Sequence, residues 1–164
     1  MEIKLEKLAL KHAEELKTCL NNKDVVKTLN GIKFPFKLED SKKYIKDSCN
    51  NKDSYEFVII NENKLVGTVV LENPNSNKKI FEVGYVIAKP YWGKGIATKA
   101  VKEILKFAFN KLKLKKVWAG IISNNPASGR VLEKAGFKLE GKQEKQVFQN
   151  NRYYDELLYG FLRT

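Results

Sequence analysis

The chain is poor in the residues that build redox and metal centres. It has two cysteines, Cys19 and Cys49, and one histidine, His12, among 164 residues. The cysteines lie far apart without the spacing of a metal site, so we expect two free thiols and no metal cofactor. With His12 alone, a cluster of histidines around a metal is excluded, and so is a serine–histidine pair built on any other histidine.

Long apolar runs are missing as well. No stretch has the roughly 18 consecutive apolar residues of a membrane span, and residues 1–7 lack the apolar core of a signal peptide. We therefore expect a cytoplasmic protein with no membrane partner. The length suits a single domain over residues 1–164, and 43% hydrophobic residues are enough for an ordinary core.

Acidic residues are fewer than basic residues. The chain has 31 Lys and Arg against 19 Asp and Glu, a formal net charge of +12. Arginine occurs only at Arg130, Arg152 and Arg163, so the excess is almost entirely lysine. Two interpretations stay open. The lysines can reflect codon bias in a genome that also favours Asn and Ile, or they can steer a polyanionic cofactor or bring the protein to a ribosome or RNA.

Hydrophobic periodicity predicts a mixed α/β (α+β) architecture. We expect strands over residues 3–8, 55–60, 64–71, 80–88, 117–122, 137–149 and 153–162. Helices are expected over 11–22, 25–29 (capped by Asp24), 40–49, 96–109 and 126–135. The strand over 80–88 and the strand over 117–122 are joined through a helix, which predicts a parallel pair. The sum is a sheet of about seven strands flanked by helices.

The turn Gly93-Lys94-Gly95 lies between an apolar strand and a long helix. Such a turn leaves backbone N–H groups pointing outward at the positive end of a helix dipole, which suits a phosphate. It is not a P-loop, because Ile96 stands where the Ser or Thr hydroxyl belongs. It is not a dinucleotide-binding turn either, because Thr98 occupies the third glycine position and an acidic residue about 20 positions later is missing.

A second segment of the sequence has an equally distinctive pattern. Asn125 and Pro126 start a helix as N-cap and first residue, and Gly136 ends it. Together, YWGKGIAT at 91–98 and NPASGRVLEKAGFKLEG at 125–141 resemble the GCN5-related N-acetyltransferase (GNAT) superfamily, in particular its ribosomal-protein N-terminal acetyltransferase (Rim-type) branch. A weaker match is YYD at 153–155. The superfamily's loop usually begins with Gln or Arg; here Trp92 stands there, as is frequent in this branch.

The resemblance implies a single-domain GNAT fold, with a mostly antiparallel sheet and a central parallel strand pair that splays apart. It also implies acetyl-CoA as co-substrate, with no metal. The loop would hold the pyrophosphate through its backbone, and the preceding strand would pair with the pantetheine arm. The cofactor-binding residues implied are Val86, Ile87, Ala88, Trp92, Gly93, Lys94, Gly95, Ile96, Ala97, Thr98, Asn125, Ser128 and Arg130. Arg130, Lys134 and Lys99 meet the 3′-phosphate or are simply solvated charges.

Two side chains are candidates for catalysis. Glu82 is the candidate general base, acting through water on the amine, or it is a strand glutamate in a salt bridge. Ser128 is the candidate acid that protonates the leaving thiolate, or it only caps its helix. The superfamily's usual tyrosine acid comes slightly later in that helix, where this chain has Val131 and Leu132. Asn125 resembles the residue that binds pantetheine, and it also suits an N-cap.

The function implied is acetyl-CoA-dependent N-acetylation of a primary amine, here a protein N-terminal α-amine, by direct attack. Two alternatives stay open. One is a small acceptor such as a polyamine, amino sugar or antibiotic, and the other is a non-enzymatic basic module that binds CoA or RNA. The chain is a monomer or a homodimer on this view. Aromatic and acidic residues that shape the acceptor pocket, or pack in the core, are Phe34, Phe36, Tyr153, Tyr154 and Asp155.

Overall fold

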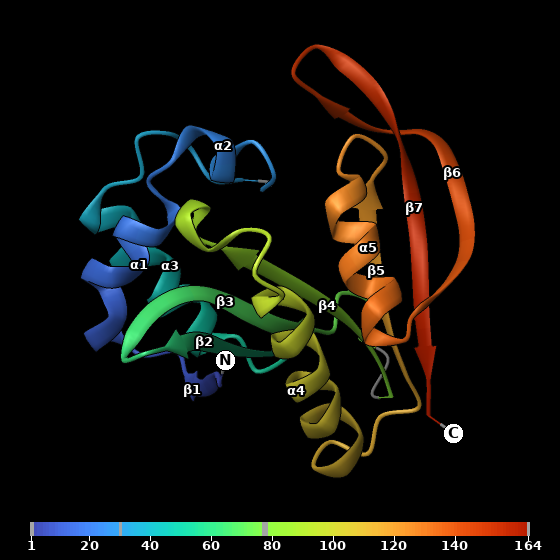
Figure 1. Ribbon diagram of the computed structural model, residues 1–164, viewed down its shortest axis with the longest axis horizontal. Helices are drawn as coiled ribbons and strands as arrows, with labels where there is room; N and C mark the ends of the chain where they lie inside the picture. Colours follow the sequence, from blue (N-terminus) through green and yellow to red (C-terminus); the bar gives the residue numbers. More distant parts are fainter. Residues whose placement is uncertain (1, 30, 77–78, 164) are drawn as a thin grey trace.

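A seven-stranded sheet runs through the protein, whose computed structural model describes residues 2–29, 31–76 and 79–163 (Figure 1). The strand order is β1-β2-β3-β4-β5-β7-β6. Only the β4–β5 pair is parallel among these neighbours, as the sequence predicts. The strands are β1 Lys4–Lys7, β2 Ser54–Asn61, β3 Lys64–Glu72, β4 Ile80–Ile87, β5 Lys116–Ile122, β6 Lys138–Gln149 and β7 Arg152–Leu162.

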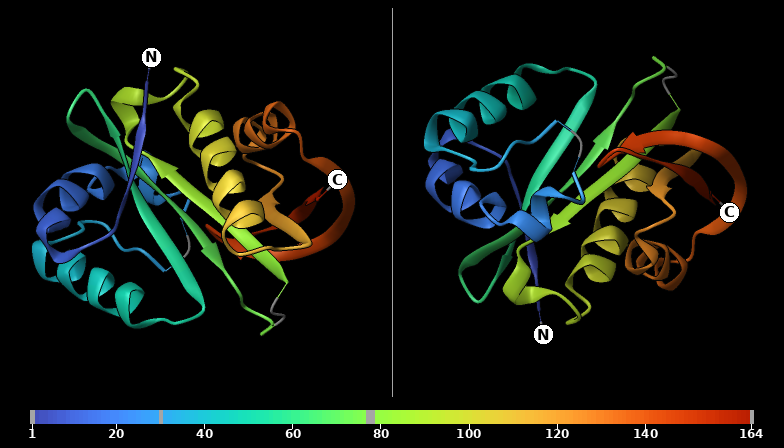
Figure 2. Two further views of the ribbon diagram at one scale, coloured as in Figure 1. Left: turned by 90° about the horizontal axis from the view of Figure 1, so that it is seen from below. Right: turned by 90° about the horizontal axis from the view of Figure 1, so that it is seen from above.

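Helices cover both faces of the sheet (Figure 2). One face carries α1 (Ala13–Leu20), α2 (Lys23–Val26) and α3 (Leu38–Asn50), preceded by the short 3-10 helix η1 (Leu10–His12). The other carries α4 (Ile96–Asn110) and α5 (Pro126–Ala135), and a second 3-10 helix, η2 (Lys89–Tyr91), leads from β4 toward α4. In the part of the chain described, no helix combines the length and the apolar character that crossing a membrane requires.

The core divides into two clusters, one on each side of β4. Phe81, Val83 and Ile87 pack with the apolar side of α4, including Ile104. Val86 packs with the cluster formed by α1, α3 and the loop between them. Successive side chains of a strand point to opposite faces, so an apolar run with few polar residues is what a central strand needs.

β4 and β5 separate soon after they begin. They pair at three positions, Ile80 with Lys116, Phe81 with Val117 and Glu82 with Trp118. Beyond that point β4 follows β3 as far as Ile87, while β5 follows β7 to Ile122. An opening therefore forms between the carboxyl ends of two neighbouring strands, the place where open α/β sheets bind ligands.

Both ends of α5 agree with the sequence, whereas the bounds of α1, α2 and α3 differ from the expected ones by one to three residues. Asn125 caps α5 and Gly136 ends it in the left-handed conformation (φ 102°), as predicted. The cap of α2 is Asn22 rather than Asp24, because the Asn22 Oδ1 accepts from the N–H groups of Asp24 and Val25. The helix α2 ends at Val26, earlier than the expected residue 29. The helix α3 begins two residues before Asp40, whose carboxylate accepts from the Lys37 N–H at 2.8 Å.

Replacement of Ile104 by alanine tests the core between α4 and the sheet. Ile104 is fully buried there, so the change should lower the free energy of unfolding by about 2–5 kcal/mol. Urea denaturation measures the difference. Lys102→Ala, on the exposed side of the same helix, is the control and should change stability by less than about 0.5 kcal/mol. Equal effects of the two substitutions would contradict this packing.

Candidate active site

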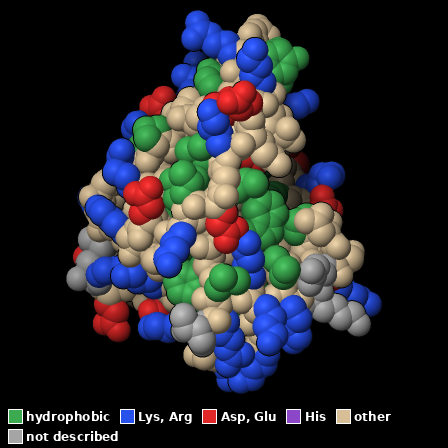
Figure 3. Space-filling model, turned by 90° about the vertical axis from the view of Figure 1, so that its right-hand side faces the viewer, with side chains coloured by type: hydrophobic (Ala, Val, Ile, Leu, Met, Phe, Trp, Pro, Cys, Tyr) green, Lys and Arg blue, Asp and Glu red, His purple; other side chains and the backbone are tan. Residues whose placement is uncertain are grey.

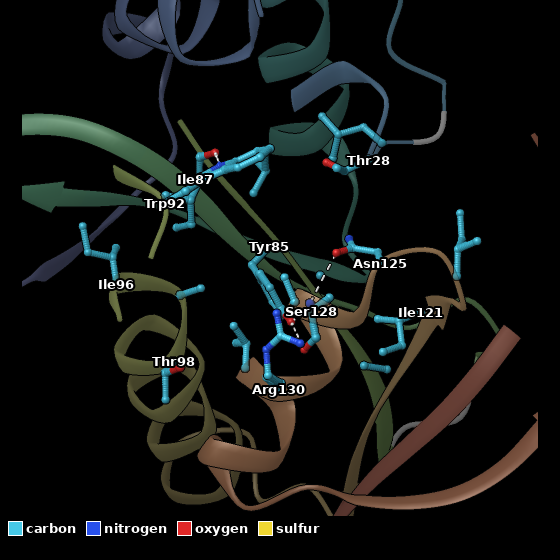
Figure 4. A pocket seen from close by; sticks show the side chains of 18 of the residues that line it. Thr28, Tyr85, Ile87, Trp92, Ile96, Thr98, Ile121, Asn125, Ser128 and Arg130 are labelled. Atoms are coloured by element: carbon cyan, nitrogen blue, oxygen red, sulfur yellow. Dashed lines mark hydrogen bonds between the residues drawn. The ribbon is translucent and has the colours of Figure 1, made fainter. Parts of the chain in front are cut away.

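The opening between β4 and β5 continues into a cavity of about 700 Å³. Its walls come from β4, the glycine turn, the start of α4, β5 and the first turns of α5, and its mouth lies between residues 27–29 and the β6–β7 turn (Figure 4). A hydrogen bond at 3.0 Å from the Gln149 side chain to the Lys27 carbonyl bridges this mouth. Of the coenzyme residues implied by the sequence, eleven line the cavity: Val86, Ile87, Trp92, Gly93, Gly95, Ile96, Ala97, Thr98, Asn125, Ser128 and Arg130. Ala88 and Lys94 do not line it.

The glycine turn has a conformation that other residues adopt only at a cost. Gly93 and Gly95 have φ of 74° and 75°, in the left-handed region. A Cβ at either position would meet nothing within 4 Å, so the turn is open on its outer side. No side chain caps the start of α4, and its first turn carries no acidic residue. The N–H groups there are therefore available to an anion.

Trp92 fastens this turn to the end of β4. Its indole N–H donates to the Ile87 carbonyl at 2.6 Å. The Lys89 ammonium lies 4.1 Å from the centre of the Trp92 ring, a favourable cation–π distance. Where the superfamily usually has Gln or Arg, this chain therefore has a side chain that bonds to its own strand.

The register of β4 decides which of its backbone groups face the opening. The Ala88 N–H donates to the Val66 carbonyl of β3 at 2.8 Å. Because backbone groups alternate along an antiparallel ladder, those of Val86 also face β3. The groups of Tyr85 and Ile87 point the other way, into the opening. We therefore expect Tyr85 and Ile87, rather than Val86 and Ala88, to present backbone groups to the coenzyme.

The start of α5 presents a cluster of polar groups to the cavity. The Asn125 side chain accepts from the Ser128 N–H at 3.4 Å, so it caps the helix. The Ser128 hydroxyl oxygen lies 2.7 Å from the hydroxyl oxygen of Tyr85, a residue of β4 (Figure 4). Tyr85 was missed in the sequence because its partner is 43 positions away; a tyrosine in the strand before the turn is the only local signal.

Glu82 lies beside the cavity rather than on its wall. Burial raises the pKa of Glu82 to about 7, with smaller contributions from the carboxylates of Glu72 and Glu156 and an opposing hydrogen bond from the Gly120 N–H. Gly120 does line the cavity. Across the described ranges no salt bridge involves Glu82, which removes the alternative of an ion-paired strand glutamate.

The remaining acceptor-pocket candidates lie elsewhere. None of Phe34, Phe36, Tyr153, Tyr154 and Asp155 lines the cavity. Phe36 is buried in the cluster below α1 and α3, and Tyr153 stacks on Phe148 on the exposed β6–β7 hairpin. Asp155 accepts from the Lys145 N–H at 2.9 Å, which occupies one of its oxygens within the hairpin.

The charged residues on the cavity wall are all cations. They are Lys27, Arg130 and Lys134. No Asp or Glu of the described ranges lines the cavity, and no group of three potential metal ligands is found among the residues that the structure describes. A glycine turn, an uncapped helix start and three cations together fit a phosphate-bearing co-substrate.

Comparison with known proteins agrees with this site. A family model described as an acetyltransferase (GNAT) domain matches residues 2–138. The chain belongs to the GNAT acetyltransferase family. The prophage-derived N-acetyltransferase YokL of Bacillus subtilis is 29% identical over 143 residues, which are 85% of this chain and 79% of YokL. The ribosomal-protein-serine acetyltransferase of Escherichia coli is 26% identical over 144 residues, 86% of this chain and 80% of that protein.

A solved GNAT structure also superposes on nearly the whole chain. The microcin C7 self-immunity acetyltransferase MccE, in complex with acetyl-CoA and AMP, has a TM-score of 0.88 at 27% identity and covers 99% of this chain and 93% of its own. The GNAT fold expected from the resemblance is thus confirmed. This GNAT protein is accordingly an N-acetyltransferase with acetyl-CoA as donor.

The two tryptophans of the chain allow binding at the turn to be measured directly. Trp118→Phe leaves Trp92, on the cavity wall, as the only indole, so CoA should change its fluorescence in a saturable way. Trp92→Phe removes the bond to Ile87 and should weaken CoA binding about two- to tenfold by calorimetry, since one hydrogen bond contributes about 0.5–1.5 kcal/mol. Trp118→Phe is the calorimetric control. A silent Trp92 at saturating CoA would place the coenzyme elsewhere.

Proposed function

We propose that this enzyme acetylates the α-amino group of a protein N-terminus, as the Rim-type branch does. The acetyl-CoA pyrophosphate lies on the N–H groups that follow Gly93 and Gly95. The pantetheine arm runs along the opening and bonds to the backbone of Tyr85 and Ile87, and Asn125 donates to it from the other wall. The thioester is then held between β4 and the start of α5.

The charge of the cavity wall carries the assignment of the acceptor. Lys27, Arg130 and Lys134 are cationic, and no described residue of the wall is acidic; the co-substrate phosphates offset the cations, but no carboxylate on the wall attracts a further positive charge. A polyamine keeps several positive charges when one nitrogen reacts, and like charges at short range are unfavourable. An N-terminal α-amine has a pKa of about 7.7–8.0, so roughly a tenth to a sixth of it is neutral at pH 7, far more than of an amine with a pKa near 10. The wall therefore suits an α-amine better than a polycation.

One observation favours a small cationic acceptor instead. The carboxylates of Glu72 and Glu156 act on Glu82 strongly enough to raise its pKa. These three side chains lie on the sheet face opposite α4. If the acceptor approaches from that face, an ammonium group would meet negative charge. A polyamine or amino sugar is therefore the second candidate acceptor.

In the mechanism we propose, the amine attacks the thioester carbonyl directly. Glu82 takes the amine proton through a water molecule, because its carboxylate does not line the cavity and lies beside the β4–β5 opening near Gly120. A carboxylate with a pKa near 7 is matched to this task, since a base works best with a pKa near the working pH. Ser128, at the positive end of α5, gives a proton to the departing sulfur.

Three of the lysines lie away from this chemistry. Lys111, Lys113 and Lys115 are exposed in the loop after α4, at the end of the molecule where Lys and Arg side chains gather (Figure 3). The 15 residues of α4 hold this loop about 22 Å from the glycine turn. These lysines are therefore too remote to bind the coenzyme, and we assign them to association with a ribosome or RNA.

A panel of acceptors tests the proposal. Acetyl-CoA is offered with hexapeptides that begin with Ser, Ala or Met, with the same peptides blocked by N-terminal formylation, and with spermidine and glucosamine. We expect thiol release with free peptides at least tenfold above that with the small amines, and none with blocked peptides. Faster turnover of spermidine would transfer the assignment to the second candidate. Absence of CoA binding at millimolar ligand would refute the function altogether.

The pH dependence of turnover tests Glu82. Because Glu82 is the base only when deprotonated, kcat for the best panel amine should rise with pH through about 7 and then level. Glu82→Gln should lower kcat about 100-fold or more and abolish this rise. The neutral amide resembles the protonated carboxyl, so the variant should fold.

Glu72→Gln is the matched control for this profile. It removes a neighbouring negative charge that raises the pKa of Glu82, so the rise should persist but move to lower pH. An unchanged profile in both variants would show that Glu82 does not provide the proton acceptor.

A further inference from the structure

The cavity contains a pair of hydroxyl groups that joins β4 to the start of α5. The Tyr85 Oη lies 2.7 Å from the Ser128 Oγ and 3.1 Å from the Ser128 carbonyl oxygen. Both residues line the cavity, and in Figure 4 the tyrosine side chain points directly at Ser128. The ring comes from the strand and the serine from the first turn of the helix, so this contact also fixes the two walls relative to each other.

A serine alone is a poor acid for a thiolate. An aliphatic hydroxyl is a far weaker acid than a thiol, whose pKa is about 8.5 in cysteine, whereas the phenol of tyrosine has a pKa of about 10. A phenol behind the serine therefore reduces the mismatch in acidity. Burial raises the pKa of Tyr85 to about 12, which keeps the hydroxyl protonated at neutral pH but makes it a weaker acid than a free phenol.

The hydrogen-bond inventory allows such a transfer. Tyr85 and Ser128 have one hydroxyl proton each, and the Ser128 carbonyl can only accept. When Tyr85 donates to the Ser128 Oγ, the serine proton is free to point into the cavity. In the 3.1 Å contact Tyr85 donates to the Ser128 carbonyl, whereas either hydroxyl can donate in the 2.7 Å contact. The relay therefore requires the Tyr85 proton to turn from the carbonyl oxygen to the Ser128 Oγ.

No other described side chain of α5 or its surroundings offers the same chemistry to Ser128. Val131 and Leu132, one turn later in the helix, are aliphatic. Tyr159 is the other hydroxyl near the start of α5, but it donates to Glu133 at 3.1 Å. The tyrosine available to Ser128 is thus supplied by the strand rather than by the helix.

We propose that Tyr85 is a positioning residue that holds Ser128 and replaces the proton which Ser128 gives to the leaving sulfur; this inference rests on the proposed function. As the carbon–sulfur bond breaks, its electron pair goes to sulfur and the Ser128 proton forms the thiol. The Tyr85 proton moves to the Ser128 Oγ, and the phenolate takes a proton from water. The amine proton leaves through Glu82 to solvent, so protons and charge balance over one turnover.

A double-mutant cycle tests this inference. The variants are Tyr85→Phe, Ser128→Ala and the pair, assayed with acetyl-CoA and the panel amine that turns over fastest. Tyr85→Phe should lower kcat about 10- to 100-fold while the KM for acetyl-CoA changes less than twofold. Because Tyr85 acts through Ser128, the double variant should be no slower than Ser128→Ala alone. Effects that multiply in the double variant would overturn the inference, and so would a kcat of Tyr85→Phe within twofold of wild type.

Two further variants separate a relay from a structural contact. Ser128→Thr keeps a hydroxyl, so adding Tyr85→Phe to it should still lower kcat. If Tyr85 only packed against its neighbours, adding Tyr85→Phe would lower kcat equally in Ser128→Thr and in Ser128→Ala. Tyr159→Phe removes the neighbouring hydroxyl that bonds to Glu133 and should leave kcat within twofold. If Tyr85→Phe does not fold, the test rests on one comparison instead. Ser128→Thr must then retain at least tenfold more kcat than Ser128→Ala.

The outcomes distinguish this inference from the proposed function. A wild-type enzyme with no turnover on any panel amine refutes both. A wild-type enzyme that turns over a peptide, with Tyr85→Phe equally fast, refutes the relay and leaves the acetyltransferase assignment intact.

Discussion

The separation of β4 and β5 after three paired residues is the constraint on which the site depends. Parallel strands that stayed paired would use their backbone groups on each other and leave no space. Here each strand keeps its outer antiparallel partner, so the sheet remains stable while its centre opens. The same opening exposes the backbone of Tyr85 and Ile87. The start of α4 lies at one end of it and the start of α5 at the other.

Two glycines and a tryptophan then set the position of the helix start. The left-handed turns at Gly93 and Gly95 let the chain leave β4 and begin α4 without a capping side chain. Trp92 bonds back to Ile87 and so limits how far the turn can move from the strand. The site is therefore held by backbone geometry and one indole, and the cations on its wall add attraction for phosphate without being needed for shape.

Local patterns predicted well what local forces decide. The Asn125 cap and the Gly136 end of α5 follow from residues a few positions apart. Three features did not follow. Residue parity along β4 depends on its register with β3, and the bond between Tyr85 and Ser128 joins distant elements. The cap of α2 involved a choice between Asn22 and Asp24, two positions apart, that propensity does not resolve.

In the mechanism we propose, the opening lets an acid and a base work on one thioester without neutralising each other. Glu82 lies on one face of the sheet beside Gly120, where burial and two carboxylates favour its protonated form. Ser128 and Tyr85 lie on the other face, at the positive end of α5, where negative charge on sulfur is stabilised. If both groups shared a face, they would hydrogen-bond to each other. Because the sheet separates them and only the reacting groups pass through the gap, proton removal and proton supply occur on opposite sides of the carbonyl.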